Sequence, residues 1–126
     1  MDTHSVQARK SDVPFADFNV WFLDLVKKTK PRLIVAIARG AVRLLQLQMV
    51  RQLLPDVPIT SECALPFLPL SVLKGQRVLI FDDSLIFGAT MWEVRHYLRT
   101  RGARVTCAAY IIDRETFYGE SRYPTE

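Results

Sequence analysis

VLIFDDSLIFGAT, residues 78–90, is the stretch that decides the fold of this chain. Its first four residues are apolar and β-favouring, which is typical of a strand covered on both faces of a sheet. Asp82 and Asp83 follow directly, so the strand would deliver two acids to the edge of the sheet. After a short loop, Gly88-Ala89-Thr90 is predicted to open a helix that a glycine ends just after Arg101.

The residues of this stretch suit an anion at one end and a diol or a metal at the other. Backbone N–H groups of the loop and of the first helical turn can bind an anion, helped by the helix dipole. Gly88 lets the backbone approach closely, and Thr90 adds a hydroxyl. The adjacent carboxylates favour sugar hydroxyls or hydrated Mg²⁺. The pattern indicates a sugar phosphate site; solvated acids or a phosphoryl-transfer site of another doubly wound fold are the alternatives.

Strands alternate with helices along the rest of the chain. Apolar strands are predicted at 33–38 and 104–112, a further strand around 57–62, and a helix over 41–54. This alternation predicts an α/β fold with a doubly wound, mostly parallel sheet and right-handed crossovers. Because ligands bind beyond the carboxyl ends of the strands in such sheets, Arg39-Gly40, directly after the first strand, is a second candidate site.

The domain organisation is expected to be simple. Residues 1–13 are predicted to be a flexible arm, and residues 14–126 a single domain. A helix is expected to begin at Pro14, since Ser11 and its neighbour offer caps and Pro suits the first helical position. Residues 63–76 are rich in Pro and Leu and are predicted to be a loop.

Composition fits an ordinary globular protein. The chain has 126 residues, of which 49% are hydrophobic and 24% charged, enough for one domain with its own core. No apolar run reaches the ~20 residues of a membrane span, and the first dozen residues are polar, so we expect a cytoplasmic protein without a membrane partner. Cys63 and Cys107 are expected to be buried, reduced thiols.

The charge balance is mildly basic. Seventeen Lys and Arg residues stand against 13 Asp and Glu, a formal net charge of +4. The basic residues are scattered, apart from a small cluster at Arg95, Arg99, Arg101 and Arg104. Aromatic residues are not interleaved with them as a stacking platform requires, which favours a solvated helix face over a nucleic-acid patch. A basic protein can equally be suited to anionic small molecules such as phosphates.

Residues 78–90 resemble the phosphoribosyl diphosphate signature of the type I phosphoribosyltransferases: four apolar residues, two acids, a short loop and Gly-x-Thr. Residues 33–45, LIVAIARGAVRLL, look like the strand, turn and helix that carry the diphosphate loop in this family, with Arg39-Gly40 at the turn. The resemblance extends over about residues 33–112 and implies the core fold of that family.

The resemblance also implies roles for individual residues. Asp82 and Asp83 would contact the ribose hydroxyls and Mg²⁺, partly through water. The backbone of Ile86, Phe87, Gly88, Ala89 and Thr90, with the Thr90 hydroxyl, would hold the 5-phosphate. The Arg39-Gly40 turn would hold the diphosphate, and such a turn can contain a non-proline cis peptide, a strained form costing about 3–4 kcal/mol. In the family reaction a nitrogen nucleophile displaces diphosphate, and catalysis rests on positioning and on neutralising the departing charge.

The chain departs from the family pattern in three places. Ile86 and Phe87 stand where the family usually has an acid and then Thr or Ser; that acid is the general base in several members. The 63–76 segment is short where the family places a flexible hairpin loop. The hood that grips the base is expected to be reduced, because only residues 113–126 follow the last strand.

Three functions follow as hypotheses. The first is transfer of phosphoribose, with Mg²⁺, to a nitrogen acceptor with release of diphosphate. The second is a catalytically inactive relative that binds phosphoribosyl diphosphate or a nucleotide as a regulatory signal. The third is an interaction module that has kept the fold and lost the ligand, and that acts within a larger assembly; a homo-oligomer is the other assembly expected. Ile86 and Phe87 favour the second and third, whereas the intact Asp82, Asp83 and Gly-x-Thr favour the first and second.

Overall fold

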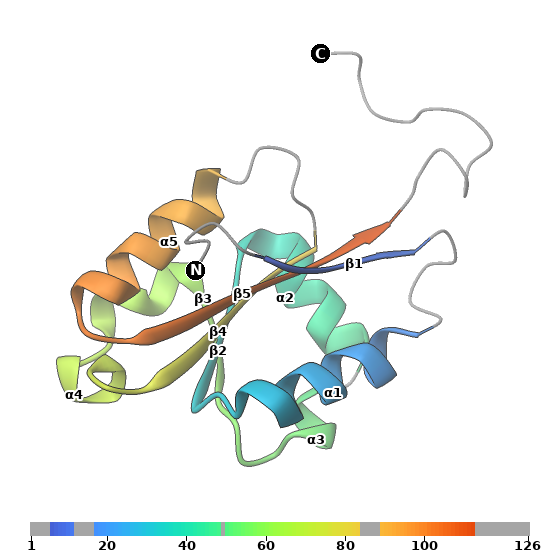
Figure 1. The fold of residues 1–126 in the computed structure, drawn as a ribbon, viewed down its shortest axis with the longest axis horizontal. Coiled ribbons are helices and arrows are strands. Elements are labelled where there is room, and N and C mark those ends of the chain that lie inside the picture. Colours follow the sequence, from blue (N-terminus) through green and yellow to red (C-terminus); the bar gives the residue numbers. More distant parts are fainter. Residues whose placement is uncertain (1–5, 12–16, 49, 84–88, 113–126) are drawn as a thin grey trace.

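A computed structural model describes residues 6–11, 17–48, 50–83 and 89–112 (Figure 1). Within them, five strands form one parallel sheet in the order β1-β5-β4-β2-β3. The strand bounds are β1 Gln7–Ser11, β2 Leu33–Ala36, β3 Ile59–Ser61, β4 Arg77–Asp82 and β5 Arg104–Ile112. The predicted doubly wound, mostly parallel α/β fold is therefore confirmed. The apolar runs that precede the two candidate sites form the neighbouring strands β2 and β4.

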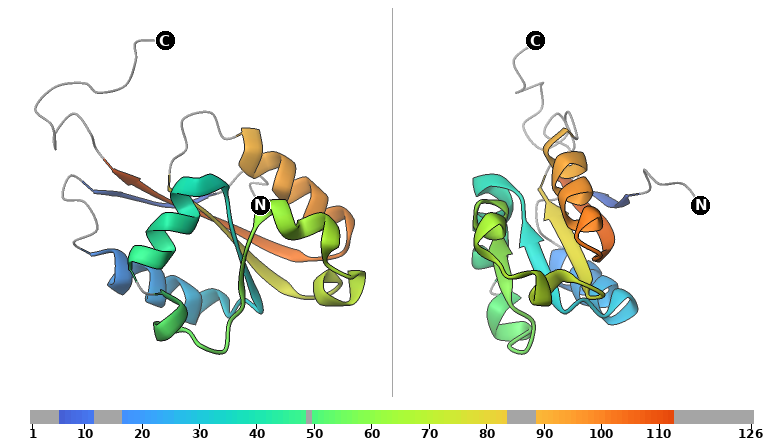
Figure 2. Two further views of the ribbon diagram at one scale, coloured as in Figure 1. Left: turned by 180° about the vertical axis from the view of Figure 1, so that it is seen from behind. Right: turned by 90° about the vertical axis from the view of Figure 1, so that its left-hand side faces the viewer.

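Helices cover both faces of the sheet (Figure 2). Their bounds are α1 Phe18–Thr29, α2 Ala38–Leu47, α3 Val50–Leu53, the 3₁₀ helix η1 Glu62–Phe67, α4 Leu70–Leu73 and α5 Ala89–Thr100. Alternate residues of each central strand enter two separate cores. Leu79 and Phe81 of β4 pack under α1 and α2, whereas Val78 and Ile80 pack under η1, α4 and α5. Burial on both faces explains why these strands are continuously apolar.

Helix α1 packs against the sheet through buried aromatic side chains. Phe18 and Phe22 are fully buried, and their rings stack with centroids 5.2 Å apart. Phe22 meets Phe81 of β4 edge to face at 5.3 Å. The helix is described from Phe18, one turn later than predicted, and Pro14 lies outside the described residues.

Two segments differ from the sequence prediction. The flexible arm predicted over residues 1–13 is wrong for 7–11, which form β1 and pair in parallel with β5. This edge strand is polar and its described side chains are largely exposed, so no apolar pattern reveals it. The loop predicted over 63–76 contains η1 and α4; the Ser61 hydroxyl accepts a hydrogen bond from the Cys63 N–H at 3.2 Å and caps the first of them.

The remaining predictions concern the second helical region and the connection between β3 and β4. The helix predicted over 41–54 corresponds to α2 and α3, and α2 begins three residues earlier than expected, at Ala38. The connection from β3 to β4 carries no strand, in agreement with the expected reduction of the family's hairpin loop. No helix among the described residues is long and apolar enough to span a membrane.

Candidate functional site

The candidate site lies where β2 and β4 end side by side. The Ile37 N–H donates to the Phe81 carbonyl at 2.9 Å, and this hydrogen bond continues the parallel pairing of the two strands to their carboxyl ends. Asp82 is the last residue of β4 and Asp83 follows it; both are half-buried. The sheet thus presents the two predicted acids at its carboxyl edge, where ligands bind in doubly wound folds.

Gly40 brings the second predicted segment against these acids. A Cβ atom built on Gly40 would lie 2.7 Å from the carboxyl carbon of Asp83, closer than real Cβ atoms come to a neighbour. Only a residue without a side chain therefore fits here while the Asp83 carboxylate keeps its place. The two sequence motifs, 43 residues apart, meet in one site because parallel strand pairing brings the two strand ends together.

The Arg39-Gly40 segment does not form the predicted turn. Helix α2 starts directly after β2, with Ile37 as its extended N-cap residue, so Arg39 and Gly40 lie in its first turn. No cis peptide bond occurs in the described part of the chain, so the cis peptide expected from the resemblance is not found here. The N-cap makes no side-chain hydrogen bond. Gly40 is the residue of this first turn that lies beside the Asp83 carboxylate.

The phosphate end of the predicted site is described only in part. Ile86, Phe87 and Gly88 lie outside the described residues. Ala89 begins α5, as predicted, and Thr90 is exposed in its first turn. Helix α5 thus starts shortly after the two acids and presents its N-terminus at the end of the sheet where they lie.

The acid pair is compatible with Mg²⁺. Among the described residues no group of three or more His, Cys, Asp and Glu side chains could hold a metal ion. Mg²⁺ is usually held by one or two carboxylates together with substrate oxygens and water, rather than by a complete cage of protein ligands. Two adjacent, half-buried carboxylates, Asp82 and Asp83, fit that mode.

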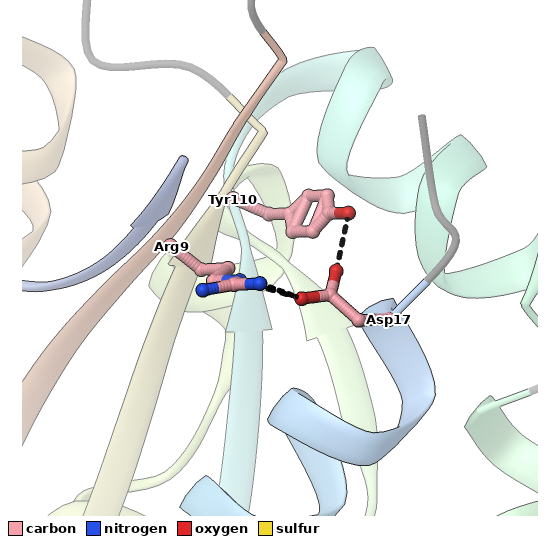
Figure 3. Close-up of polar contacts among 3 residues, drawn as sticks. All are labelled: Arg9, Asp17 and Tyr110. Carbon is pink, nitrogen blue, oxygen red and sulfur yellow. Dashed lines mark hydrogen bonds and ion pairs between the residues drawn. The ribbon is translucent and has the colours of Figure 1, made fainter. Parts of the chain in front are cut away.

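Arg9, Asp17 and Tyr110 form a polar network at the same end of the sheet that was not predicted from the sequence (Figure 3). The hydroxyl of the fully buried Tyr110 donates to Asp17 at 2.9 Å, and Arg9 Nε donates to the other Asp17 oxygen at 2.6 Å. The hydrogen bond from Tyr110, helped by Arg9, lowers the pKa of Asp17 below its ordinary value of 3.8, against a smaller opposing effect of burial. The network links the start of α1 to β1 and β5. The only sign of it in the sequence was a tyrosine within a largely apolar strand.

Other reactive side chains lie away from the acids. Cys107 is a buried thiol, as predicted, and burial raises its pKa to about 11. Cys63 is exposed, contrary to the prediction; it lies in η1, whose buried residue is Leu65. A cavity of about 350 Å³ lies between α2, α3 and β3, and none of the predicted site residues lines it.

Comparisons with known proteins point to one family. No family model matches the chain. Over 52 residues the chain is 42% identical to an adenine phosphoribosyltransferase of Rhodospirillum centenum, and over 54 residues it is 39% identical to that of Novosphingobium aromaticivorans. These segments are 41% and 43% of this chain, and 30% of each relative, so less than a third of either enzyme is matched.

A solved structure extends the likeness to most of the fold. The crystal structure of a purine phosphoribosyltransferase from Pyrococcus horikoshii superposes with a TM-score of 0.56. The match covers 83% of this chain and 86% of the other at 19% sequence identity. At this identity the match establishes a shared fold.

Proposed function

We propose that this chain, which is similar in part of its sequence to adenine phosphoribosyltransferases and in fold to a purine phosphoribosyltransferase, binds phosphoribosyl diphosphate with Mg²⁺ at the carboxyl edge of its sheet. The observation that carries the proposal is the contact between Gly40 and Asp83, which joins the two motifs of the family in one place. A cytoplasmic location, expected from the sequence, stays a prediction.

Each part of the site has a task in this proposal. Asp82 and Asp83 accept hydrogen bonds from the ribose diol and hold Mg²⁺, which would neutralise charge on the diphosphate when bound. The first turn of α5, with the Thr90 hydroxyl and the backbone of Ile86 to Ala89, receives the 5-phosphate. The first turn of α2, at Arg39 and Gly40, faces the diphosphate.

Transfer of phosphoribose to a purine is the chemistry to test first, because the relatives include adenine phosphoribosyltransferases. Ile86 has no proton to give or take, although the family often places an acid there. Without a general base the rate falls by about 10²–10⁴. This departure from the family pattern favours a second candidate function, a catalytically inactive relative that binds the same ligand as a regulatory signal.

Calorimetry with phosphoribosyl diphosphate and Mg²⁺ tests the binding proposal. We expect saturable binding by the unmodified chain and none by the double variant Asp82→Asn/Asp83→Asn. The matched control is Asp24→Asn/Asp56→Asn, which removes two exposed acids outside the proposed site and changes the net charge equally. Silence of the unmodified chain at millimolar ligand, or equally weakened binding in both variants, would refute the proposed site.

A diphosphate-release assay separates the two candidate functions. Adenine, the other purines and pyrimidines are supplied in turn as acceptors with phosphoribosyl diphosphate and Mg²⁺. Release that depends on one acceptor and disappears in the Asp82→Asn/Asp83→Asn variant supports a transferase. Binding without release supports the catalytically inactive relative that binds the ligand as a regulatory signal.

A further inference from the structure

Three arginines stand in a row at the edge of the sheet opposite the candidate site. Arg77 and Arg104 are the first residues of β4 and β5 and are paired in register. Arg32 precedes β2, and its N–H donates to the Arg77 carbonyl at 2.7 Å. Because neighbouring strands lie about 4.8 Å apart, the three Cα atoms form a row about 10 Å long.

The three side chains belong to one face of the sheet. The residues that follow them, Leu33, Val78 and Val105, belong to the core under α4 and α5. Since side chains alternate along a strand, the arginines lie on the opposite face, the side of α1. Arg77 Nε donates to the Lys30 carbonyl at 2.7 Å, which places it at the carboxyl end of that helix.

Helix α1 adds three lysines to this row. Lys27 and Lys28 occupy its last turn, and Lys30 ends it in a left-handed conformation. All six side chains are exposed. We call this surface the basic edge; it consists of Lys27, Lys28, Lys30, Arg32, Arg77 and Arg104.

The positive charge of the basic edge is poorly balanced. Within the described residues, Lys28 pairs with Asp24, and none of the three arginines makes an ion pair. Asp56, in the turn before β3, is an exposed acid at the same end of the sheet, and it makes no ion pair with these arginines. Like charges on neighbouring strands destabilise a sheet. Arg77 supports the end of α1, but no described contact gives the side chains of Arg32 and Arg104 a structural role.

We propose that the basic edge binds the phosphate backbone of a nucleic acid, independently of the function proposed for the opposite edge. The guanidinium fork matches phosphate oxygens, and arginine is favoured where phosphates are recognised. Three of the six exposed residues of the basic edge are lysines, which are depleted in protein interfaces, and charged residues are depleted at the centre of such interfaces. Backbone contacts without aromatic stacking imply binding that depends on salt and little on sequence.

The test measures fluorescence anisotropy of labelled RNA and DNA, single-stranded and duplex, at about 50–200 mM salt. The variant is Arg32→Gln/Arg104→Gln. The matched control is Arg43→Gln/Arg51→Gln, which removes two exposed arginines of α2 and α3 and lowers the net charge equally. Because every phosphate-binding cation adds to affinity at low salt, we expect binding at least about tenfold weaker in the variant and much less affected in the control.

Three results would overturn the proposal. They are the absence of binding at the lowest salt, equally weakened binding in the two variants, and tighter binding of polyglutamate than of any oligonucleotide, which would indicate an acidic protein partner. Binding that survives saturating phosphoribosyl diphosphate with Mg²⁺, and that is at least about tenfold weaker in Arg32→Gln/Arg104→Gln but not in the control, would support it. This outcome does not depend on whether the opposite edge binds that ligand.

Discussion

The contact between Gly40 and Asp83 is the most specific feature of the site at the scale of single residues. A side chain at position 40 and the observed Asp83 carboxylate cannot occupy the same space. Glycine is otherwise a poor residue for a helical turn, costing up to about 1 kcal/mol relative to alanine. Its presence in the first turn of α2 is therefore explained by the carboxylate beside it and not by the helix.

The Gly40→Ala variant should separate stability from binding. Alanine favours the helix but displaces the Asp83 side chain, so the free energy of unfolding should change by less than about 1 kcal/mol. Affinity for phosphoribosyl diphosphate with Mg²⁺ should fall by at least about tenfold, which corresponds to about 1.4 kcal/mol. Denaturant unfolding and calorimetry measure the two quantities.

A double-mutant cycle identifies the cause of that weaker binding. If Gly40→Ala acts through Asp83, it should add little to the effect of Asp83→Asn, because the two residues are in contact. Fully additive effects would contradict the role assigned to this contact.

The two thiols should react at different rates. Cys63 is exposed, whereas Cys107 is buried and its pKa is raised to about 11. Because the thiolate is the reactive form, a disulfide reagent should label one thiol of the native protein quickly and the second only after unfolding. Cys63→Ser should abolish the fast phase. Two fast thiols in the native protein would show that Cys107 is not buried in solution.

At the scale of the elements, β1 and α1 are held to the sheet by polar contacts as well as by packing. Asp17 accepts hydrogen bonds from Tyr110 of β5 and Arg9 of β1, so one carboxylate joins three elements. A hydrogen bond to a charged group contributes more than one between neutral groups. The network therefore links the edge strand β1, through Arg9, to the start of α1 and to β5.

The Tyr110→Phe variant should lose stability in a pH-dependent way. The lowered pKa of Asp17 means that its contribution is complete above the unfolded value of 3.8 and is lost as pH falls through the lower folded value. We expect a destabilisation of about 1–2 kcal/mol near neutral pH that shrinks as the pH falls below 3.8 and Asp17 becomes protonated. Chemical denaturation across this range measures it.

Tyr97→Phe is the matched control for that experiment. The Tyr97 hydroxyl donates at 3.4 Å to the Leu65 carbonyl, a neutral acceptor, so its smaller effect should not vary across the acid range. Equal pH profiles for the two variants would contradict the assignment of the charged hydrogen bond to Asp17.

At the scale of the whole molecule, the strands buried in the sheet and the edge strand β3, which falls within the predicted 57–62, could be predicted from the sequence, whereas the edge strand β1 could not. Continuous apolar runs identified β2, β4 and β5, because strands buried on both faces have few polar positions. Strand β1 was missed because QARKS is polar and only its pairing with β5 makes it a strand. Pairing across the sheet, which local patterns do not encode, also gathers the basic edge from three separate segments.

The candidate site could be predicted as far as the apolar strands that lead to it, but not where it depends on contacts between segments distant in the sequence. The strand end placed Asp82 and Asp83 correctly, since they followed a recognisable apolar run. The start of α2 was misplaced, because Arg39-Gly40 is typical of a turn and the packing of Gly40 against Asp83 is a long-range contact. Local sequence therefore predicted that these residues lie at the carboxyl ends of the strands. It did not predict which residues contact one another there.

A crystal structure of the chain with phosphoribosyl diphosphate and Mg²⁺ tests the central claim most directly. We predict the ribose diol and the metal on Asp82 and Asp83, the 5-phosphate at the start of α5, and the diphosphate facing Gly40. Density for the ligand in the cavity between α2, α3 and β3, or a carboxyl edge left without ligand at saturating concentration, would contradict the account.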